Sequence, residues 1–109
     1  AYVSGYCAAK HAVVGLTRSL AEETATLGVT VNAVCPGYTD TAIIRTGVEN
    51  ISKKTGRSKK EALEHFTSVN PQKRLIMPKE VASAVSWLCS EDSAAITGQC
   101  ISVSAGEVT

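Results

Sequence analysis

Tyr6 and Lys10 are the residues of this sequence whose types and spacing most directly suggest chemistry. They stand four positions apart, so in a helix both side chains project from one face. A free phenol has a pKa near 10, so a phenol that exchanges protons near neutral pH needs its ionised form stabilised by about 4 kcal/mol. A neighbouring ammonium supplies part of that stabilisation in a partly desolvated site. The pair is a candidate for general acid–base catalysis, although two unrelated surface residues often share this spacing by chance.

A second candidate site follows a predicted β-strand. Alternating apolar residues over 29–35 predict the strand, and Pro36-Gly37 breaks it at its carboxyl end. In open parallel sheets, ligands bind outside the carboxyl ends of the strands. Gly37 would let the backbone approach a ligand closely, and Thr39 and Thr41 offer hydroxyl and amide donors. The alternative is an ordinary turn after a strand.

The helix before this strand must position Tyr6 and Lys10. Apolar residues recur at spacings of three and four over 5–27, the pattern of a helix that buries one face. Gly28 is a suitable stop, because glycine adopts the left-handed turn at little cost. A helix followed directly by an apolar strand suggests half of a βαβ unit, hence an α/β fold with a parallel sheet. The rest of that sheet must come from elsewhere, because one or two strands cannot form a sheet covered on both faces.

The remaining elements surround a more polar insertion at about 42–77. Ser58 and Glu61 form a capping box that opens a short helix to about residue 69, and a second short helix is plausible near 48–55. Pro78, at a first helical position, opens a helix to about residue 90. We expect a loop at 90–95 and a short strand at 100–103.

This succession of motifs resembles the carboxyl-terminal part of the short-chain dehydrogenase/reductase family, of the type with a Tyr-x-x-x-Lys pair. The segments that carry the resemblance are 6–10, 31–35, 36–41, 78–82 and 96–99, and the resemblance runs over nearly all 109 residues. The family's glycine-rich nucleotide loop and catalytic Ser lie upstream of its Tyr-x-x-x-Lys pair and have no counterpart in this sequence. We therefore expect residues 1–109 to be the carboxyl-terminal part of one Rossmann-like domain, a doubly wound parallel sheet with a lid at about 42–77.

The resemblance implies a role for each candidate residue. Tyr6 matches the family's general acid/base, and Lys10 matches the residue that stabilises the ionised phenol and hydrogen-bonds the nicotinamide ribose, so both are expected to contact the cofactor as well. The segment that holds the nicotinamide carboxamide is matched by Pro36, Gly37, Thr39 and Thr41. The implied activity is hydride transfer that interconverts a small alcohol and a carbonyl with NAD or NADP. The residue that would distinguish the two cofactors is not in the sequence.

An alternative is a non-catalytic truncated subunit or oligomerisation module that lacks the nucleotide-binding half. In the family, the segments matched by 5–27, 78–90 and 100–103 form subunit interfaces. The resemblance therefore implies a homo-oligomer, either a dimer or a tetramer, under both interpretations.

Composition narrows the remaining possibilities. The net charge of +1 gives no field that would favour nucleic acid, and no apolar run approaches the roughly 20 residues of a membrane span. The four cysteines match no zinc or redox spacing, so we expect no metal site and small buried thiols in a reducing, cytoplasmic compartment.

Two features of the insertion region stay open. Tyr38 could line a substrate pocket or be a surface turn residue. A basic run could be a solvated face of the lid or a docking surface for an anionic substrate tail. Within residues 45–60, Glu49 is the only acidic residue. The basic run consists of Arg45, Lys53, Lys54, Arg57, Lys59 and Lys60.

Overall fold

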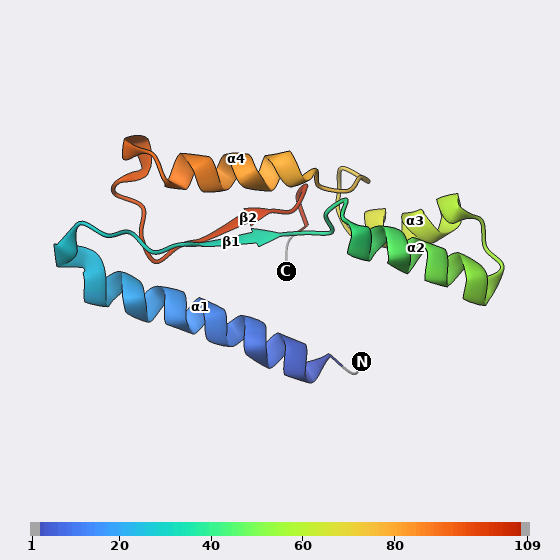
Figure 1. Ribbon diagram of the computed structural model, residues 1–109, viewed down its shortest axis with the longest axis horizontal. Coiled ribbons are helices and arrows are strands. Elements are labelled where there is room, and N and C mark those ends of the chain that lie inside the picture. The colour runs from blue at the N-terminus through green and yellow to red at the C-terminus, as the bar shows by residue number, and fades with distance from the viewer. Residues whose placement is uncertain (1–2, 108–109) are drawn as a thin grey trace. The chain divides into compact units, whose positions relative to one another are not determined.

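The structure, a computed structural model, describes residues 3–107. Its elements in chain order are helix α1 (Ser4–Thr24), the 3-10 helix η1 (Ala25–Leu27), strand β1 (Ala33–Pro36), helices α2 (Ala42–Thr55), α3 (Lys59–Thr67) and α4 (Pro78–Leu88), the 3-10 helix η2 (Glu91–Ser93) and strand β2 (Cys100–Val103) (Figure 1). The described chain forms two compact units. Residues up to 34 with 84–101 make the first unit, and residues 35–83 with 102 onwards make the second.

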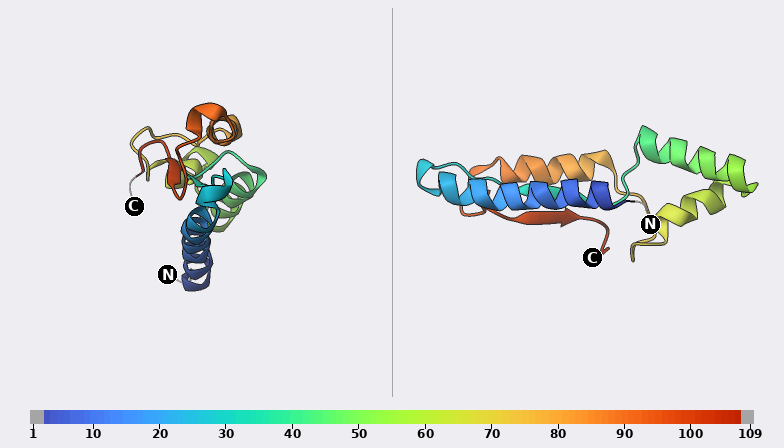
Figure 2. Two further views of the ribbon diagram at one scale, coloured as in Figure 1. Left: turned by 90° about the vertical axis from the view of Figure 1, so that its left-hand side faces the viewer. Right: turned by 90° about the horizontal axis from the view of Figure 1, so that it is seen from below.

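In the first unit, α1 confirms the long helix predicted over 5–27. The 3-10 helix η1 continues it, and Gly28 ends it in the left-handed conformation with φ of 69°. The helix contacts the segment before β2, since a Cβ added to Gly98 would lie 3.4 Å from the Cβ of the buried Ala21. Within this unit, Figures 1 and 2 show α1 and the carboxyl-terminal half of α4 on opposite sides of the strand residues 33–34 and 100–101.

The apolar face of α1 is largely exposed, contrary to the prediction that the helix buries it. Only Thr17 and Ala21 of α1 are buried, whereas Val13 and Leu16 are 52% and 58% exposed. Burial needs a partner surface, and the two short strands of the described chain supply little. The same reason makes the prediction of buried thiols wrong here, because the cysteines at 7, 35, 89 and 100 are all exposed.

Strand β1 starts at Ala33, later than the predicted start at Val29. Side chains hold the preceding residues instead of a backbone ladder. The Val31 amide donates to the Thr97 hydroxyl oxygen at 3.1 Å, and the Asn32 side chain binds the backbone of the segment before β2 through Nδ2 at 2.8 Å and Oδ1 at 3.1 Å. Asn32 therefore has a structural role.

The two strands form a parallel pair. The amide of Ala33 donates to the Gln99 carbonyl at 2.8 Å, and the amide of Gly37 donates to the Val103 carbonyl at 3.1 Å. Both partners advance in the same direction, which confirms the predicted parallel α/β arrangement. Strand β2 covers the residues predicted for it, and η2 occupies part of the expected loop at 90–95.

In the second unit, α2 and α3 form a helical hairpin (Figure 2). The predicted capping box of α3 is confirmed, since the Ser58 hydroxyl accepts from the Glu61 amide at 3.2 Å and the Glu61 carboxylate accepts from the Ser58 amide at 2.8 Å. Helix α2 starts at Ala42 and is longer than the predicted helix near 48–55. The apolar pattern of the sequence did not predict the first half of α2. That half follows directly after Thr41, and its position depends on the tertiary structure around the turn at 36–41.

The segment between α3 and α4 contains two buried residues, Asn70 and Ile76, whose hydrogen bonds hold it in place. Asn70 is 1% exposed, and its Nδ2 donates to the Arg74 carbonyl at 2.9 Å. Ile76, also 1% exposed, forms an isolated parallel bridge with Thr39. The core of this unit therefore lies beside the turn that follows β1.

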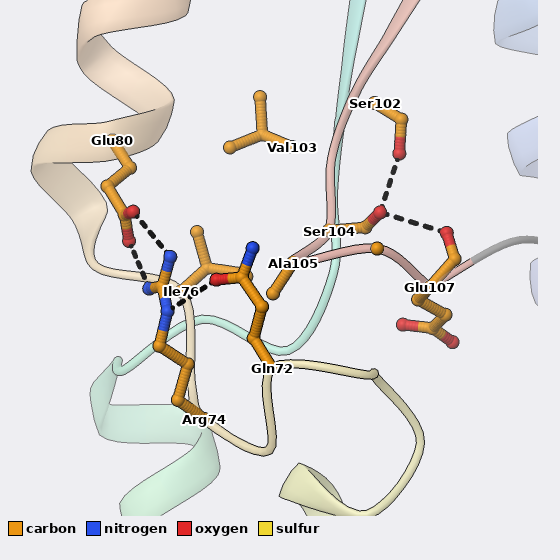
Figure 3. Close-up of a pocket in the computed structure, with 10 residues that line it drawn as sticks. Gln72, Arg74, Ile76, Glu80, Ser102, Val103, Ser104, Ala105 and Glu107 are labelled. Atoms are coloured by element: carbon orange, nitrogen blue, oxygen red, sulfur yellow. Dashed lines mark hydrogen bonds and ion pairs between the residues drawn. The ribbon is translucent and has the colours of Figure 1, made fainter.

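An ion pair fixes the start of α4, which begins at Pro78 as predicted. Arg74 donates through Nη1 and Nη2 to the two carboxylate oxygens of Glu80, at 2.7 and 2.8 Å (Figure 3). Glu80 also accepts from the Met77 amide at 2.8 Å. Together the Arg74 guanidinium and the Met77 amide lower the pKa of Glu80 from 4.5 to about 2.

This lowered pKa predicts an acid-sensitive contribution to stability. Because the folded-state pKa of Glu80 lies below the unfolded one, the stabilisation is present above about pH 4.5 and is lost as the pH falls to about 2. Glu80→Gln should lower the Tm of the full-length protein at neutral pH, and its deficit should disappear over that range. Thermal unfolding across the range measures this, with the exposed Glu64→Gln on α3 as control. A deficit that is independent of pH would contradict the assignment.

The capping box predicts a second effect on stability. Ser58→Ala removes the acceptor for the Glu61 amide and should lower the Tm by roughly 2–4 °C in a subunit of family size. Ser58→Thr keeps the hydroxyl and should restore most of the loss. Equal unfolding temperatures for the Ala and Thr variants would show that the cap does not stabilise α3.

Candidate functional site

Tyr6 and Lys10 project together from α1 in the first unit. The Nζ atom of Lys10 lies 5.3 Å from the centroid of the Tyr6 ring, a cation–π distance. Tyr6 is 66% exposed, so its hydroxyl is open to a bound molecule. The neighbouring His11 is already engaged, because its Nδ1 lies 2.8 Å from the Cys7 carbonyl oxygen. The helix therefore presents a phenol with a cation fixed beside it.

The turn that follows β1 lies in the second unit, and it holds the other predicted site residues. Pro36 is the last residue of β1, and Gly37 pairs with β2. A Cβ added to Gly37 would lie 3.2 Å from the Cα of Ser104 and 3.3 Å from an Oε atom of Glu107. The sequence suggested that glycine here admits a ligand, and the structure adds a close approach of two backbone segments.

The two threonines of this turn play different parts. The hydroxyl of Thr39 donates to the Gly37 carbonyl at 2.9 Å, so it fixes the turn internally. Thr41 occupies the N-cap position of α2 in an extended conformation, and its side chain makes no capping hydrogen bond. The exposed Thr41 hydroxyl and the amides of the first turn of α2 are donors that can meet an external acceptor.

Asp40, between the two threonines, is paired within the turn. Its carboxylate lies 2.9 Å from Nε of Arg45, and this hydrogen bond lowers the pKa of Asp40 below its ordinary value. One member of the basic run is thus engaged in a local ion pair. Both interpretations of the remaining basic residues stay predictions.

Tyr38 meets a partner that sequence spacing could not reveal. Its ring lies edge-on to Phe66 of α3, with centroids 5.2 Å apart and planes at 76°. A pair separated by almost the whole α2–α3 hairpin leaves no periodic signal. The contact ties the turn at 36–41 to the predicted lid.

The described residues of the second unit line a cavity and a groove. A cavity of about 420 Å³ beside the Arg74–Glu80 pair includes Ser102, Ser104 and Glu107 in its lining (Figure 3). A groove of about 510 Å³ between α2 and α3 has apolar walls that include Ile44, Val48, Leu63 and Leu75, with Lys59 and Lys60 at its rim.

Within residues 3–107, no group of three or more His, Cys, Asp or Glu side chains is placed to hold a metal ion. None of the described helices combines the length and apolar character that crossing a membrane requires.

Comparisons with known proteins show the family to which the chain belongs. A sequence model described as "Enoyl-(Acyl carrier protein) reductase" matches residues 1–107. The uncharacterized oxidoreductase YxjF of Bacillus subtilis is 41% identical over 104 residues, which cover 94% of this chain and 40% of that protein. The chain therefore spans about two-fifths of this curated relative's length.

Solved structures agree with the sequence match. A short chain dehydrogenase family protein from Francisella tularensis superposes with a TM-score of 0.90 at 33% identity, over 95% of this chain and 43% of that one. An F189W variant of actinorhodin polyketide ketoreductase, solved with NADPH, superposes with a TM-score of 0.81 at 40% identity, over 92% of this chain and 38% of that one. The fold is a partial Rossmann-like fold, and the family's sequence model matches nearly the whole chain. This chain therefore belongs to the short-chain dehydrogenase/reductase family and corresponds to a carboxyl-terminal portion of such a protein.

Proposed function

We propose that the protein containing this chain is an NAD(P)-dependent oxidoreductase that interconverts an alcohol and a carbonyl, with Tyr6 as general acid/base. The observation that carries the proposal is the exposed Tyr6 phenol with the Lys10 ammonium 5.3 Å from its ring centroid. Family membership supports it, as does the NADPH named with the actinorhodin ketoreductase.

Tyr6 and Lys10 divide the proton chemistry between them. The Tyr6 hydroxyl gives a proton to the carbonyl oxygen in reduction and takes it back in oxidation. The Lys10 ammonium stabilises the negative charge on the phenolic oxygen while the proton is transferred. The same group donates a hydrogen bond to a ribose hydroxyl of the dinucleotide. The nicotinamide supplies the hydride chemistry when bound, and the protein positions and polarises the groups around it.

The turn at 36–41 has the donors that a carboxamide needs. Because the Thr41 hydroxyl is not used for capping, it can donate to the carboxamide oxygen beside the free amides of α2. Pro36, Gly37 and Thr39 contribute backbone, which β2 and Ile76 hold in place. This donor set fits a nicotinamide, and it does not select NAD over NADP.

A non-catalytic oligomerisation module is the second candidate. The observation in its favour is the exposed apolar stripe of α1, which includes Val13, Leu16 and Leu20. Such a stripe fits contact with another subunit, and a homodimer or homotetramer of a small-molecule enzyme would contain it too. A cytoplasmic location remains a prediction. Turnover by the full-length protein distinguishes the two candidates.

The catalytic assignment predicts a specific loss. Tyr6→Phe removes the proton donor and keeps the ring, so turnover in the full-length protein should fall by about 10²–10⁴-fold while dinucleotide affinity changes little. Steady-state reduction of a carbonyl compound and dinucleotide titration measure the two quantities. Retention of more than about a tenth of wild-type turnover would sink the assignment.

The close approach at Gly37 predicts a binding defect. Gly37→Ala places a methyl group 3.2 Å from the Ser104 backbone, so the turn must shift and dinucleotide affinity should fall by about tenfold or more. Gly15→Ala on α1 is a matched control, because no atom of residues 3–107 lies within 4 Å of its added Cβ. Equal affinities for the two variants would remove the turn from the cofactor site.

A further inference from the structure

Phe66 is held in one orientation by aromatic neighbours. Its ring meets Tyr38 edge-on at 5.2 Å and His65 edge-on at 5.4 Å, with interplanar angles of 76° and 80°. Edge-to-face geometry is the favoured arrangement of such pairs and adds to the stabilisation from area burial. A ring at the end of α3 therefore has a defined position against the turn at 36–41.

Helix α2 is shaped to admit this ring. A Cβ added to Gly47 would lie 3.1 Å from Cζ of Phe66, closer than an ordinary carbon contact. Glycine lowers helix stability at an interior position, so its presence in the middle of α2 needs a packing reason. Phe66 supplies that reason, and its half-buried ring lies against both α2 and Tyr38.

The backbone of Tyr38 is fixed, while part of the residue remains accessible. Its carbonyl accepts from the Ile76 amide at 2.9 Å, and the amide of Asp40, two residues further on, donates to the Ile76 carbonyl at 2.9 Å. Tyr38 is nevertheless 41% exposed. With its backbone hydrogen-bonded to Ile76 and its ring in contact with Phe66, Tyr38 still has part of its side chain available to a ligand.

We propose that Tyr38 lines the site for the carbonyl substrate and that Phe66 is a positioning residue, the two rings forming a latch between α3 and the turn at 36–41. This inference rests on the proposed function, because Gly37 and Thr39 flank Tyr38 and belong to the proposed carboxamide-binding segment. The latch sets the position of the lid relative to the cofactor, and so it sets the fit of the substrate.

The experiment compares KM, kcat and Tm in Tyr38→Leu, Phe66→Leu and the double variant of the full-length protein. Reduction of ethyl 3-oxobutanoate and ethyl 3-oxohexanoate is followed by oxidation of NADPH or NADH, and the ester that the wild type reduces faster is used. Each single variant should raise KM by about three- to tenfold, as expected for one lost aromatic pair, with kcat within about twofold of wild type. The double variant should show no further rise, because both changes break one contact.

Gly47→Ala separates positioning from stability. The alanine raises helix propensity but displaces the Phe66 ring, so KM should rise although Tm does not fall. Phe66→Tyr keeps the aromatic ring that Phe66→Leu removes, so its KM should be close to that of the wild type. Asn50→Ala, at an exposed position in the second half of α2, is the control and should leave both values unchanged.

Two outcomes would overturn the latch. One is an unchanged KM with a lowered Tm in both Leu variants, which would reduce the pair to a packing contact. The other is an additive rise in KM, which would show that the two rings act independently. If Tyr6→Phe still abolishes turnover in either case, the proposed function stands and the latch alone fails.

Discussion

Backbone pairing at the end of β1 is the constraint on which the turn at 36–41 depends. Gly37 donates to the Val103 carbonyl, and the residues after it exchange hydrogen bonds with the buried Ile76. Two segments distant in sequence thus hold one turn from two sides. The free Thr41 hydroxyl, the ion pair of Asp40 and the ring of Tyr38 all take their positions from this frame. A close approach to Ser104 explains why glycine stands where the frame is tightest.

The proposed chemistry uses two kinds of preorganisation. On α1, helix geometry alone brings a phenol and an ammonium together, since positions four apart share a face. At the turn, donors are left unpaired by the fold, because the N-cap side chain does not satisfy the first amides of α2. The proposed proton donor is therefore positioned by one helix, whereas the proposed site for the cofactor carboxamide is built from several segments of the chain.

Exposure along α1 shows how much of this fold depends on surfaces beyond the two strands. The apolar positions of α1 have helical period, yet only Thr17 and Ala21 are buried. Buried apolar side chains of the described chain are few, namely Ala21, Ala62 and Ile76. Local devices therefore matter for the order of individual elements, among them the capping box of Ser58 and the bidentate pair of Arg74 and Glu80.

The sequence by itself determined the elements whose signals are local. The long helix with its Gly28 stop, the capping box at Ser58 and the helix opened by Pro78 arise from contacts within one or two turns, so their residues announce them. The Tyr6–Lys10 spacing and the motif order were enough to suggest the family, which the comparisons confirm.

Only the tertiary structure decided where β1 begins, how far α2 extends, what Gly37 and Gly47 approach, and which ring Tyr38 meets. These depend on segments far apart in the chain, whose meeting has no period and no fixed spacing. Burial along α1 was misjudged for the same reason. A hydrophobic pattern indicates which face of a helix is apolar, but burial of that face depends on whether another surface packs against it.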